Sequence, residues 1–435
     1  MADPADIAHL LRRTEFVARP ARMSELSSLS IAAAVDNIID FAPNGDPQLP
    51  SSLQGPPVSS GWEQYVEACN WWVGAMASRP RPFQEKMTLF WHGHFVSSWD
   101  DVDQGYQMML QNQLYRSQAL GNYRTLAQAM ALEPAMLVYL SNAGNVKGQP
   151  NQNFARELME LFLLGVGNYT EADVEAVARA WTGYNYDWTT KQYVYRATKH
   201  DSGDKTFFGM TKPWTGPQTI DEILVDNTQK RLVAAKWIAK KLWEFLAHPG
   251  PPPGVVDALA GEFVSQGMEL KPLLRALLNR PEFYTVTAKQ GLVRTPIEWF
   301  VALCVHTGLS SDEMGLSWRG ESTGQRIYAP PNVSGWRPNA YWLNTSAISG
   351  RASLARSVTW HLRNAGGFDN LYSLTPTAAV DFVANYFGVA PLSATTRTAL
   401  INAHTAERAT TKGNNWWAPT NLLTMTMLCP EFHMS

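Results

Sequence analysis

Apolar side chains recur every three to four positions along almost the whole chain, which is the spacing of one face of an α-helix. Apart from shorter helices in the first 40 residues and between 133 and 181, this spacing predicts helices over residues 62–78, 82–92, 103–118, 122–131, 228–247, 254–266, 270–279, 293–307, 347–364, 375–387, 393–408 and 418–428. We therefore expect a mainly α fold, a single large multi-helix domain that spans residues 1–435.

Three segments interrupt the helical pattern. Residues 43–61 are rich in proline, glycine and serine, which predicts a loop. Residues 182–220 form a long irregular insertion that is partly β, with residues 192–195 as the best strand candidate. Residues 316–345 are irregular again. Because long loops in compact domains often carry function, we expect the 182–220 and 316–345 insertions to form part of a site.

The composition excludes several classes of protein. With 45% hydrophobic, 17% charged and 11% aromatic residues, the chain does not resemble a disordered protein. Lysine and arginine total 36 and aspartate and glutamate 38, so the formal net charge of −2 provides no footprint for a nucleic-acid backbone, and we expect no nucleic-acid partner. The three cysteines are far apart, which indicates neither a disulfide framework nor a cysteine-based zinc site.

The N-terminal residues have no apolar run before Arg12 and Arg13, so they lack the order of charges and apolar residues that defines a signal peptide. No stretch reaches the ~18 uninterrupted apolar residues of a membrane span. We therefore expect a cytoplasmic protein without a membrane partner, although export together with a partner stays open.

His92-Gly93-His94 is the first candidate for chemistry. If the chain extends at Gly93, the two imidazoles point to the same side and can meet one metal ion. In a continuous helix they would lie about 200° apart and could not chelate. The alternative is that both histidines stabilise the negative end of a helix.

A carboxylate pair on an apolar helix is the second candidate. Glu157 and Glu160 are three residues apart and share a helix face, so something positive is expected between them. A cation, a shared proton or an arginine such as Arg156 would serve. Metal-binding helical bundles use carboxylates and histidines in this way, whereas a surface pair of Arg156 with Glu160 is the ordinary alternative.

Two irregular segments supply further candidates. His200, Asp201 and Lys205 lie in a short polar turn that combines a base, a carboxylate and a cation, which suits acid–base chemistry and equally suits a structural turn. In residues 328–336, prolines and a glycine can hold Asn332 and Trp336 toward a substrate.

The chain contains 17 tryptophans, many of them beside turn-forming residues. We expect Trp181, Trp188 and Trp336 to border the same cleft as the histidines, where flat sugar faces would stack on indole rings. Packing under the long loops is the alternative.

Several motifs together resemble one known family. They extend from the first helix to about residue 360 and comprise His9-Leu-Leu-Arg-Arg13, Phe90-Trp-His-Gly-His-Phe95, Asn153 to Phe162, Tyr169 to Val174, Thr182-Gly-Tyr184, His200-Asp201 with Lys205, and Pro331 to Trp336. In their order and number they resemble the bacterial DUF1800 family. The resemblance implies no activity, because the family has no established catalytic residues. It implies as a possible partner a sulfatase-like protein of another uncharacterised family, often encoded beside such chains.

Three functional hypotheses remain open. In the first, a metal-dependent enzyme binds a divalent ion (zinc, manganese or iron) through His92, His94, His200, Glu157 and Glu160. Its catalytic groups would be Glu157, Glu160, Asp201 and Lys205, and Arg156, Trp181, Trp188, Asn332 and Trp336 would bind a small-molecule or glycan substrate. Hydrolysis is favoured over redox chemistry, because nothing singles out a redox role.

The second hypothesis is a metal-free carbohydrate-active enzyme that uses paired carboxylates such as Glu157 and Asp201. The third is a non-catalytic binding or assembly protein, in which the polar motifs hold loops together. One expectation separates the hypotheses: the histidine and carboxylate motifs converge in one pocket under the first hypothesis and need not do so under the third.

Overall fold

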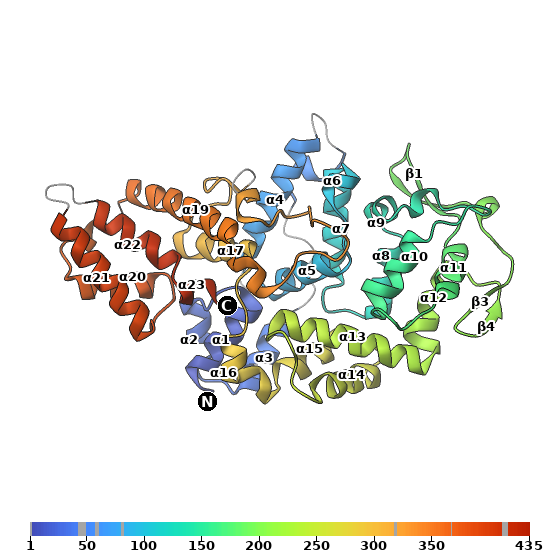
Figure 1. Cartoon of the computed structure of the whole chain (residues 1–435), viewed down its shortest axis with the longest axis horizontal. Helices are drawn as coiled ribbons and strands as arrows, with labels where there is room; N and C mark the ends of the chain where they lie inside the picture. The colour runs from blue at the N-terminus through green and yellow to red at the C-terminus, as the bar shows by residue number, and fades with distance from the viewer. Residues whose placement is uncertain are drawn as a thin grey trace.

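The computed structural model describes residues 2–41, 49–56, 61–79, 82–316, 320–366, 368–410 and 416–435. The fold is one mainly α-helical domain, as the apolar periodicity predicts (Figure 1). Its helices, numbered as in Figure 1, are α1 (Pro4–Glu15), α2 (Pro20–Leu26), α3 (Ile31–Ile39), α4 (Gly61–Ser78), α5 (Phe83–His94), α6 (Trp99–Val102), α7 (Gly105–Ser117), α8 (Tyr123–Ala131), α9 (Pro134–Tyr139), α10 (Asn153–Glu157), α11 (Glu171–Ala180), α12 (Gly216–Asp221), α13 (Thr228–Leu246), α14 (Val255–Ser265), α15 (Leu270–Leu278), α16 (Val286–Lys289), α17 (Pro296–Thr307), α19 (Thr345–Asn364), α20 (Pro376–Tyr386), α21 (Ala394–Thr410), α22 (Trp417–Met427) and α23 (Pro430–His433).

The predicted β content lies where the sequence places it. The insertion over 182–220 contains two antiparallel hairpins, β1 (Tyr184–Asp187) with β2 (Gln192–Tyr195), and β3 (Lys205–Phe207) with β4 (Met210–Lys212). The described part of the 316–345 insertion has only two short 3-10 turns. Within the predicted 43–61 loop, residues 42–48 and 57–60 lie outside the described residues, and Ser51–Leu53 forms a 3-10 turn.

Local capping chemistry sets several helix starts. Thr170 and Asp173 form a capping box at the start of α11, each side chain accepting the other's backbone N–H. Thr295 and Glu298 form the same arrangement at the start of α17. These caps satisfy backbone donors that a helix leaves free in its first turn, so the boundaries follow from short-range sequence alone.

The apolar segment that carries Glu157 and Glu160, expected to be α-helical, is α-helical only in its first part. After α10 the chain winds as a π-helix over Leu158–Leu163, and the N–H of Leu164 bonds to the carbonyl of Met159. Side chains from other elements bind the carbonyls at its end. The indole of Trp237 donates to Leu161 O at 3.0 Å, and the Tyr123 hydroxyl donates to Phe162 O at 2.6 Å.

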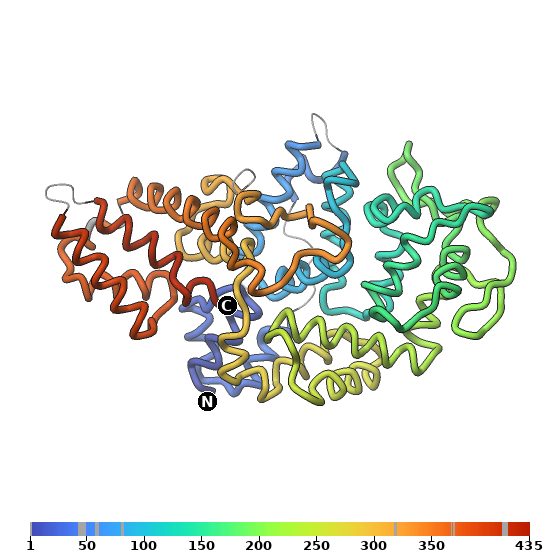
Figure 2. The backbone as a smooth tube through the Cα atoms, viewed as in Figure 1, coloured from blue at the N-terminus to red at the C-terminus, as the bar shows by residue number. Residues whose placement is uncertain are grey.

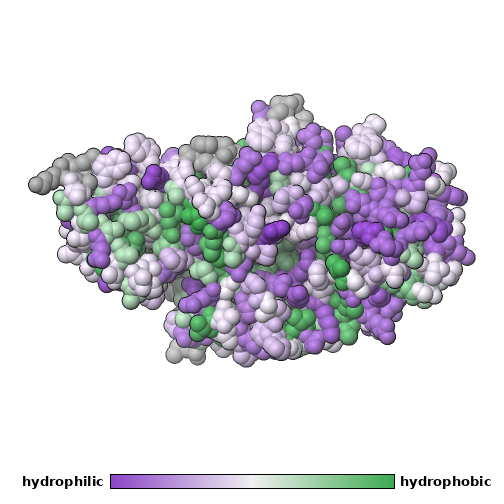
Figure 3. Space-filling model, viewed as in Figure 1, coloured by the Kyte–Doolittle hydropathy of each residue, from purple (hydrophilic) through white to green (hydrophobic). Residues whose placement is uncertain are grey.

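Two clusters of buried side chains form the core. One joins α1, α3, α5, α8, α10, α11 and α13–α15, and the other joins α4, α7, α17 and α19–α22. The partly buried Tyr139 packs against both. On the face in Figure 3, hydrophilic residues are frequent in the half of the molecule where α11 lies, and hydrophobic atoms surface in both halves.

The first and last helices lie near each other (Figure 2). Arg13 in α1 donates from Nη1 to the Ser435 hydroxyl at 2.7 Å and from Nη2 to Ala288 O. Nearby, Lys86 of α5 pairs with Glu298 of α17 in the buried interior. The first and last helices are therefore joined to the body of the domain through polar as well as apolar contacts.

Candidate functional site

His92 joins two motifs that are far apart in the sequence. Its Nε2 atom accepts the backbone N–H of Tyr328 at 3.1 Å, and its ring lies 5.3 Å from the indole of Trp336. The segment 331–336 approaches so closely that a Cβ on Gly335, whose φ is +77°, would lie 2.7 Å from the carbonyl oxygen of Gly93. Burial lowers the pKa of His92 to about 3, so the imidazole is neutral.

His94 faces a different set of residues. Its Nε2 donates to the carbonyl of Phe162 at 3.0 Å, and its ring stacks on Phe90. The expectation that the chain bends at Gly93 is wrong, because α5 continues through His94. Two residues apart on a helix lie about 200° apart, which explains why the two imidazoles contact different neighbours. This geometry removes the argument that the pair chelates one ion.

The carboxylate pair lies beside the π-helical turn. Glu160 accepts a short hydrogen bond from the Tyr169 hydroxyl. Arg156 pairs with Glu171 through two bonds of 2.7 Å at the surface, rather than with Glu160. Half-buried Glu157 has its pKa raised by burial and then by Glu160, with Arg156 opposing. The positive partner expected between the two glutamates is therefore engaged elsewhere.

In the polar turn at 200–205, the side chains of His200, Asp201 and Lys205 have hydrogen-bond or ion-pair partners within the turn, in α11 or just after it. His200 donates from Nδ1 to Thr182 O at 2.8 Å, and Asp201 pairs with Arg179 at 2.8 Å. Lys205 donates to the carbonyls of Asp201 and Gly203. These bonds tie the β3 hairpin to the end of α11, which is what a structural turn requires.

The four proposed substrate-binding residues outside α10 differ in exposure. Trp181 is fully buried, and its indole N–H donates to Thr219, so it is a core residue rather than a surface for a substrate. Trp188 is 62% exposed at the tip of the β1–β2 hairpin. Trp336 is half-buried against His92, and Asn332 is exposed, with its side chain accepting the N–H of Ser334.

The motifs therefore occupy separate environments. His92 contacts Trp336, His94 contacts Phe162, and the ring contacts of His200 are with tyrosines of the hairpin. Within the described ranges of the chain, no group of three histidine, cysteine, aspartate or glutamate side chains has an arrangement that could hold a metal ion.

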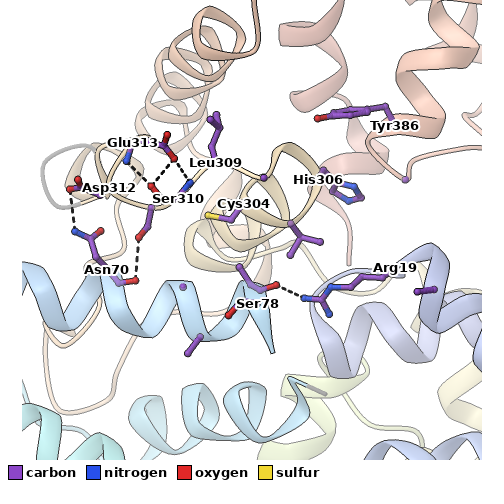
Figure 4. Close-up of a pocket in the computed structure, with 18 of the residues that line it drawn as sticks. Arg19, Asn70, Ser78, Cys304, His306, Leu309, Ser310, Asp312, Glu313 and Tyr386 are labelled. Atoms are coloured by element: carbon purple, nitrogen blue, oxygen red, sulfur yellow. Dashed lines mark hydrogen bonds between the residues drawn. The ribbon is translucent and has the colours of Figure 1, made fainter. Parts of the chain in front are cut away.

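A cavity of about 1040 Å³ opens instead among segments that carry none of these motifs. Figure 4 shows that α4 forms one wall and that the end of α17 with the loop after it forms another. The start of α2 and the end of α20 close it. Its lining includes four alanines, three glycines and the indole of Trp71. An apolar cavity of this size is the usual form of a small-molecule site.

The two ends of this cavity carry opposite charges, as Figure 4 shows. Arg19 lies at one end and donates from Nη2 to Ala77 O at 2.7 Å. Asp312 and Glu313 lie at the other end, both exposed. Two lining atoms have no hydrogen-bond partner among the described residues, the donor Nη1 of Arg19 and the acceptor Oδ1 of Asn70.

His306 adds a neutral imidazole to the same cavity. Burial, followed by the charge of Arg294, lowers its pKa to about 4, and its ring bonds to the backbone of Tyr386. Gly388 permits this position, because a Cβ there would lie 2.9 Å from Cε1 of His306 and its φ is +61°. No sequence motif pointed to His306, Arg19 or Asn70.

The whole chain matches one family model, described as a protein of unknown function (DUF1800), over residues 9–434. The chain belongs to the DUF1800 family. The DUF1800 match extends over every motif discussed above and over the cavity from Ala18 to Gly388. No curated protein and no solved structure matches the chain.

Glu133 is a buried carboxyl that no sequence motif singled out. Glu133 caps α9 through Met136 N–H and accepts from Gln111 at 2.9 Å. Burial raises its pKa to about 8.

No helix of the described part of this DUF1800 chain combines the length and apolarity that a bilayer crossing needs.

Proposed function

We propose that this protein binds a short peptide-like molecule with free charged ends in the cavity between α2, α4, α17 and α20. The observation that carries the proposal is the pairing of unmatched polar atoms with opposite charges on apolar walls. Arg19 offers a positive charge at one end, where its Nη1 atom has no hydrogen bond among the described residues and lies 3.9 Å from the Glu15 carboxylate, and Asp312 and Glu313 offer negative charges at the other.

The size of the cavity supports this class of ligand. At about 1040 Å³ it reaches the upper end of the ~300–1,000 Å³ range of small-molecule sites. Gly74 and Ala75 give α4 a shallow face, along which an extended chain can lie close to the backbone. The apolar area of Trp71 offers the large contact that anchors such ligands.

The polar atoms match a peptide better than a hydrocarbon. An amide group has both a donor and an acceptor, which are what Asn70 Oδ1 and Arg19 Nη1 lack. A buried polar atom without a partner costs free energy, so a ligand that supplies one gains affinity. The carboxylate of the ligand would face Arg19, and its ammonium group would face Asp312 and Glu313.

The same cavity favours binding over nucleophilic chemistry at its cysteine. Burial raises the pKa of the Cys304 thiol to about 12, so the reactive thiolate is scarce at neutral pH. The ring of His306 bonds to the backbone of Tyr386. The proposal therefore corresponds to the binding protein of the third sequence hypothesis.

The decisive variant fills the cavity from α4. A Cβ at Gly74 meets nothing within 4 Å, so Gly74→Leu projects into the open space without displacing the fold. Gly261→Leu is the matched control, because Gly261 is also a helical glycine with open space, on α14 outside the cavity. Both changes replace glycine in a helix, so the effect on helix propensity is shared.

The binding experiment uses calorimetry with free peptides of about four small residues. We expect saturable binding to the wild type and to Gly261→Leu, and at least about tenfold weaker binding to Gly74→Leu. Acetylated and amidated analogues should also bind about tenfold more weakly, since they lack the end charges. Equal binding to both variants, or absence of binding across a broad pool, would contradict the proposal.

Metal-dependent hydrolysis stays a prediction of the sequence. Elemental analysis of protein made without a polyhistidine tag tests it. Stoichiometric zinc, manganese or iron that falls in Glu157→Gln would support the metal site, and background levels in the wild type would contradict it. The same preparation serves both experiments, so a failure of one hypothesis is distinguishable from a failure of the other.

A further inference from the structure

A second pocket lies on the helices near the C-terminal end of the chain. Arg356, Trp360 and Arg363 are four and three residues apart on α19, so they share one face of that helix. Trp416, Trp417 and Thr420 at the start of α22 complete a pocket of about 140 Å³. We call these six residues the indole–arginine pocket.

The tryptophans of this pocket are exposed to a degree that packing does not explain. Trp360 is 58% exposed and Trp417 is 57% exposed, although indoles normally bury most of their surface. The guanidinium of Arg363 lies 5.3 Å from the ring of Trp360 and 4.9 Å from that of Trp416. This stacking holds the rings in place before any ligand arrives.

The charge of the pocket is positive. Two of its six residues are arginines and none is acidic. Among the described residues, neither Arg356 nor Arg363 forms an ion pair with a carboxylate. The pocket also lies at the N-terminus of α22, an 11-residue helix whose N-cap Trp416 supplies no side-chain cap. The partial positive charge of that terminus adds to the arginines.

We propose that the indole–arginine pocket binds one acidic sugar residue of a glycan. Indole faces accept the flat C–H face of a pyranose ring, and the arginines and the start of α22 hold its acid group. The volume suits a single ring rather than an extended ligand. The charge complementarity selects an acidic sugar over a neutral one, and the two exposed indoles select a ring over a simple anion.

The site is independent of the proposed peptide cavity. The six residues of the indole–arginine pocket do not line that cavity, which draws on α2, α4, α17 and α20. Loss of glycan binding in a pocket variant therefore leaves peptide binding as a readout of intact folding.

The test is calorimetric titration of the full chain with galacturonate oligomers. Their methyl esters keep the rings but lose the charge, and polyphosphate keeps the charge but lacks the rings. We expect saturable binding of the galacturonate oligomers, with both comparison ligands weaker by about tenfold or more. Trp360→Ala and Arg356→Gln should each weaken binding by about tenfold.

Trp62→Ala is the matched control, because Trp62 is 49% exposed at the start of α4 and lines neither the cavity nor the indole–arginine pocket. It should bind galacturonate within about twofold of the wild type. Equal affinity for polyphosphate would show that the pocket recognises charge alone. Equal affinity for the methyl esters would show that the acid group is not recognised. Tighter binding of single-stranded oligonucleotides, or unchanged binding in Trp360→Ala, would also overturn the proposal.

Discussion

The Nε2 atom of His92 accepts the backbone N–H of Tyr328 at 3.1 Å, across 236 residues of chain. This bond connects the last turn of α5 to the irregular segment that begins after α17. His92 is therefore a neutral hydrogen-bond acceptor in the interior. Its role is to hold the 320–345 segment in place.

Replacing His92 should destabilise the protein. His92→Phe keeps a ring of similar size but leaves the Tyr328 N–H buried without an acceptor, which costs about 1–3 kcal/mol. Urea denaturation should show this loss, with His361→Phe as a control on the less buried face of α19. An equal loss in both variants would contradict the importance of the bond.

Stability should be highest near pH 6.5. Burial lowers the folded-state pKa of His9 to about 2, of His92 and His433 to about 3, and of His306 to about 4. Below the ordinary value of 6.5, the unfolded chain therefore takes up protons that the folded chain does not, and the free energy of unfolding falls as the pH falls. Urea midpoints from pH 8 to 5 measure this, and a midpoint that rises from pH 6.5 to 5 would contradict it.

Glu133 should produce the opposite slope between its ordinary pKa of 4.5 and its folded-state pKa of about 8. Its pKa of about 8 lies above the ordinary value, so the folded chain holds a proton that the unfolded chain releases, and stability falls as the pH rises toward and through 8. Glu133→Gln remains neutral, and the unpaired Oε1 of Gln111 can accept its amide. We expect this variant to be more stable than the wild type at pH 9 relative to pH 6. Parallel pH profiles would exclude a shifted Glu133.

The pair of Lys86 with Glu298 should behave as a unit. Both side chains are buried, and Lys86→Met leaves the Glu298 carboxylate without its cation, which costs about 3–5 kcal/mol. The double variant Lys86→Met with Glu298→Gln should recover part of that loss. Thermal denaturation of the two single variants and the double variant gives the coupling, and additive effects would show that the pair is not coupled.

Much of the helical architecture could be predicted from the sequence. The helices over 62–78 and 228–247 are reproduced as α4 and α13 to within a residue or two, and the cap of α11 joins Thr170 and Asp173, three residues apart. These features depend on residues within one or two turns of each other. The strand over 192–195 is also local, since it pairs with β1 through a short turn.

The π-helical turn shows where local reasoning ends. Leu158–Leu163 carries an apolar pattern that fits an α-helix equally well. What stabilises the wider turn are donors from Trp237, Tyr123 and His94, which reach its terminal carbonyls from α13, α8 and α5. No window of the sequence contains those partners.

The features of this protein likewise fall into those set by local sequence and those set by tertiary contacts. The sequence by itself determined the helices, the β-hairpin insertion and the family, because periodicity, capping and motif order depend on neighbours in the chain. Only the tertiary structure decided that His92 and His94 face different neighbours and that Arg19, Asn70 and His306 meet around one cavity. The physical reason is that a side chain's environment is fixed by the helices that pack against it, and those contacts join residues hundreds of positions apart.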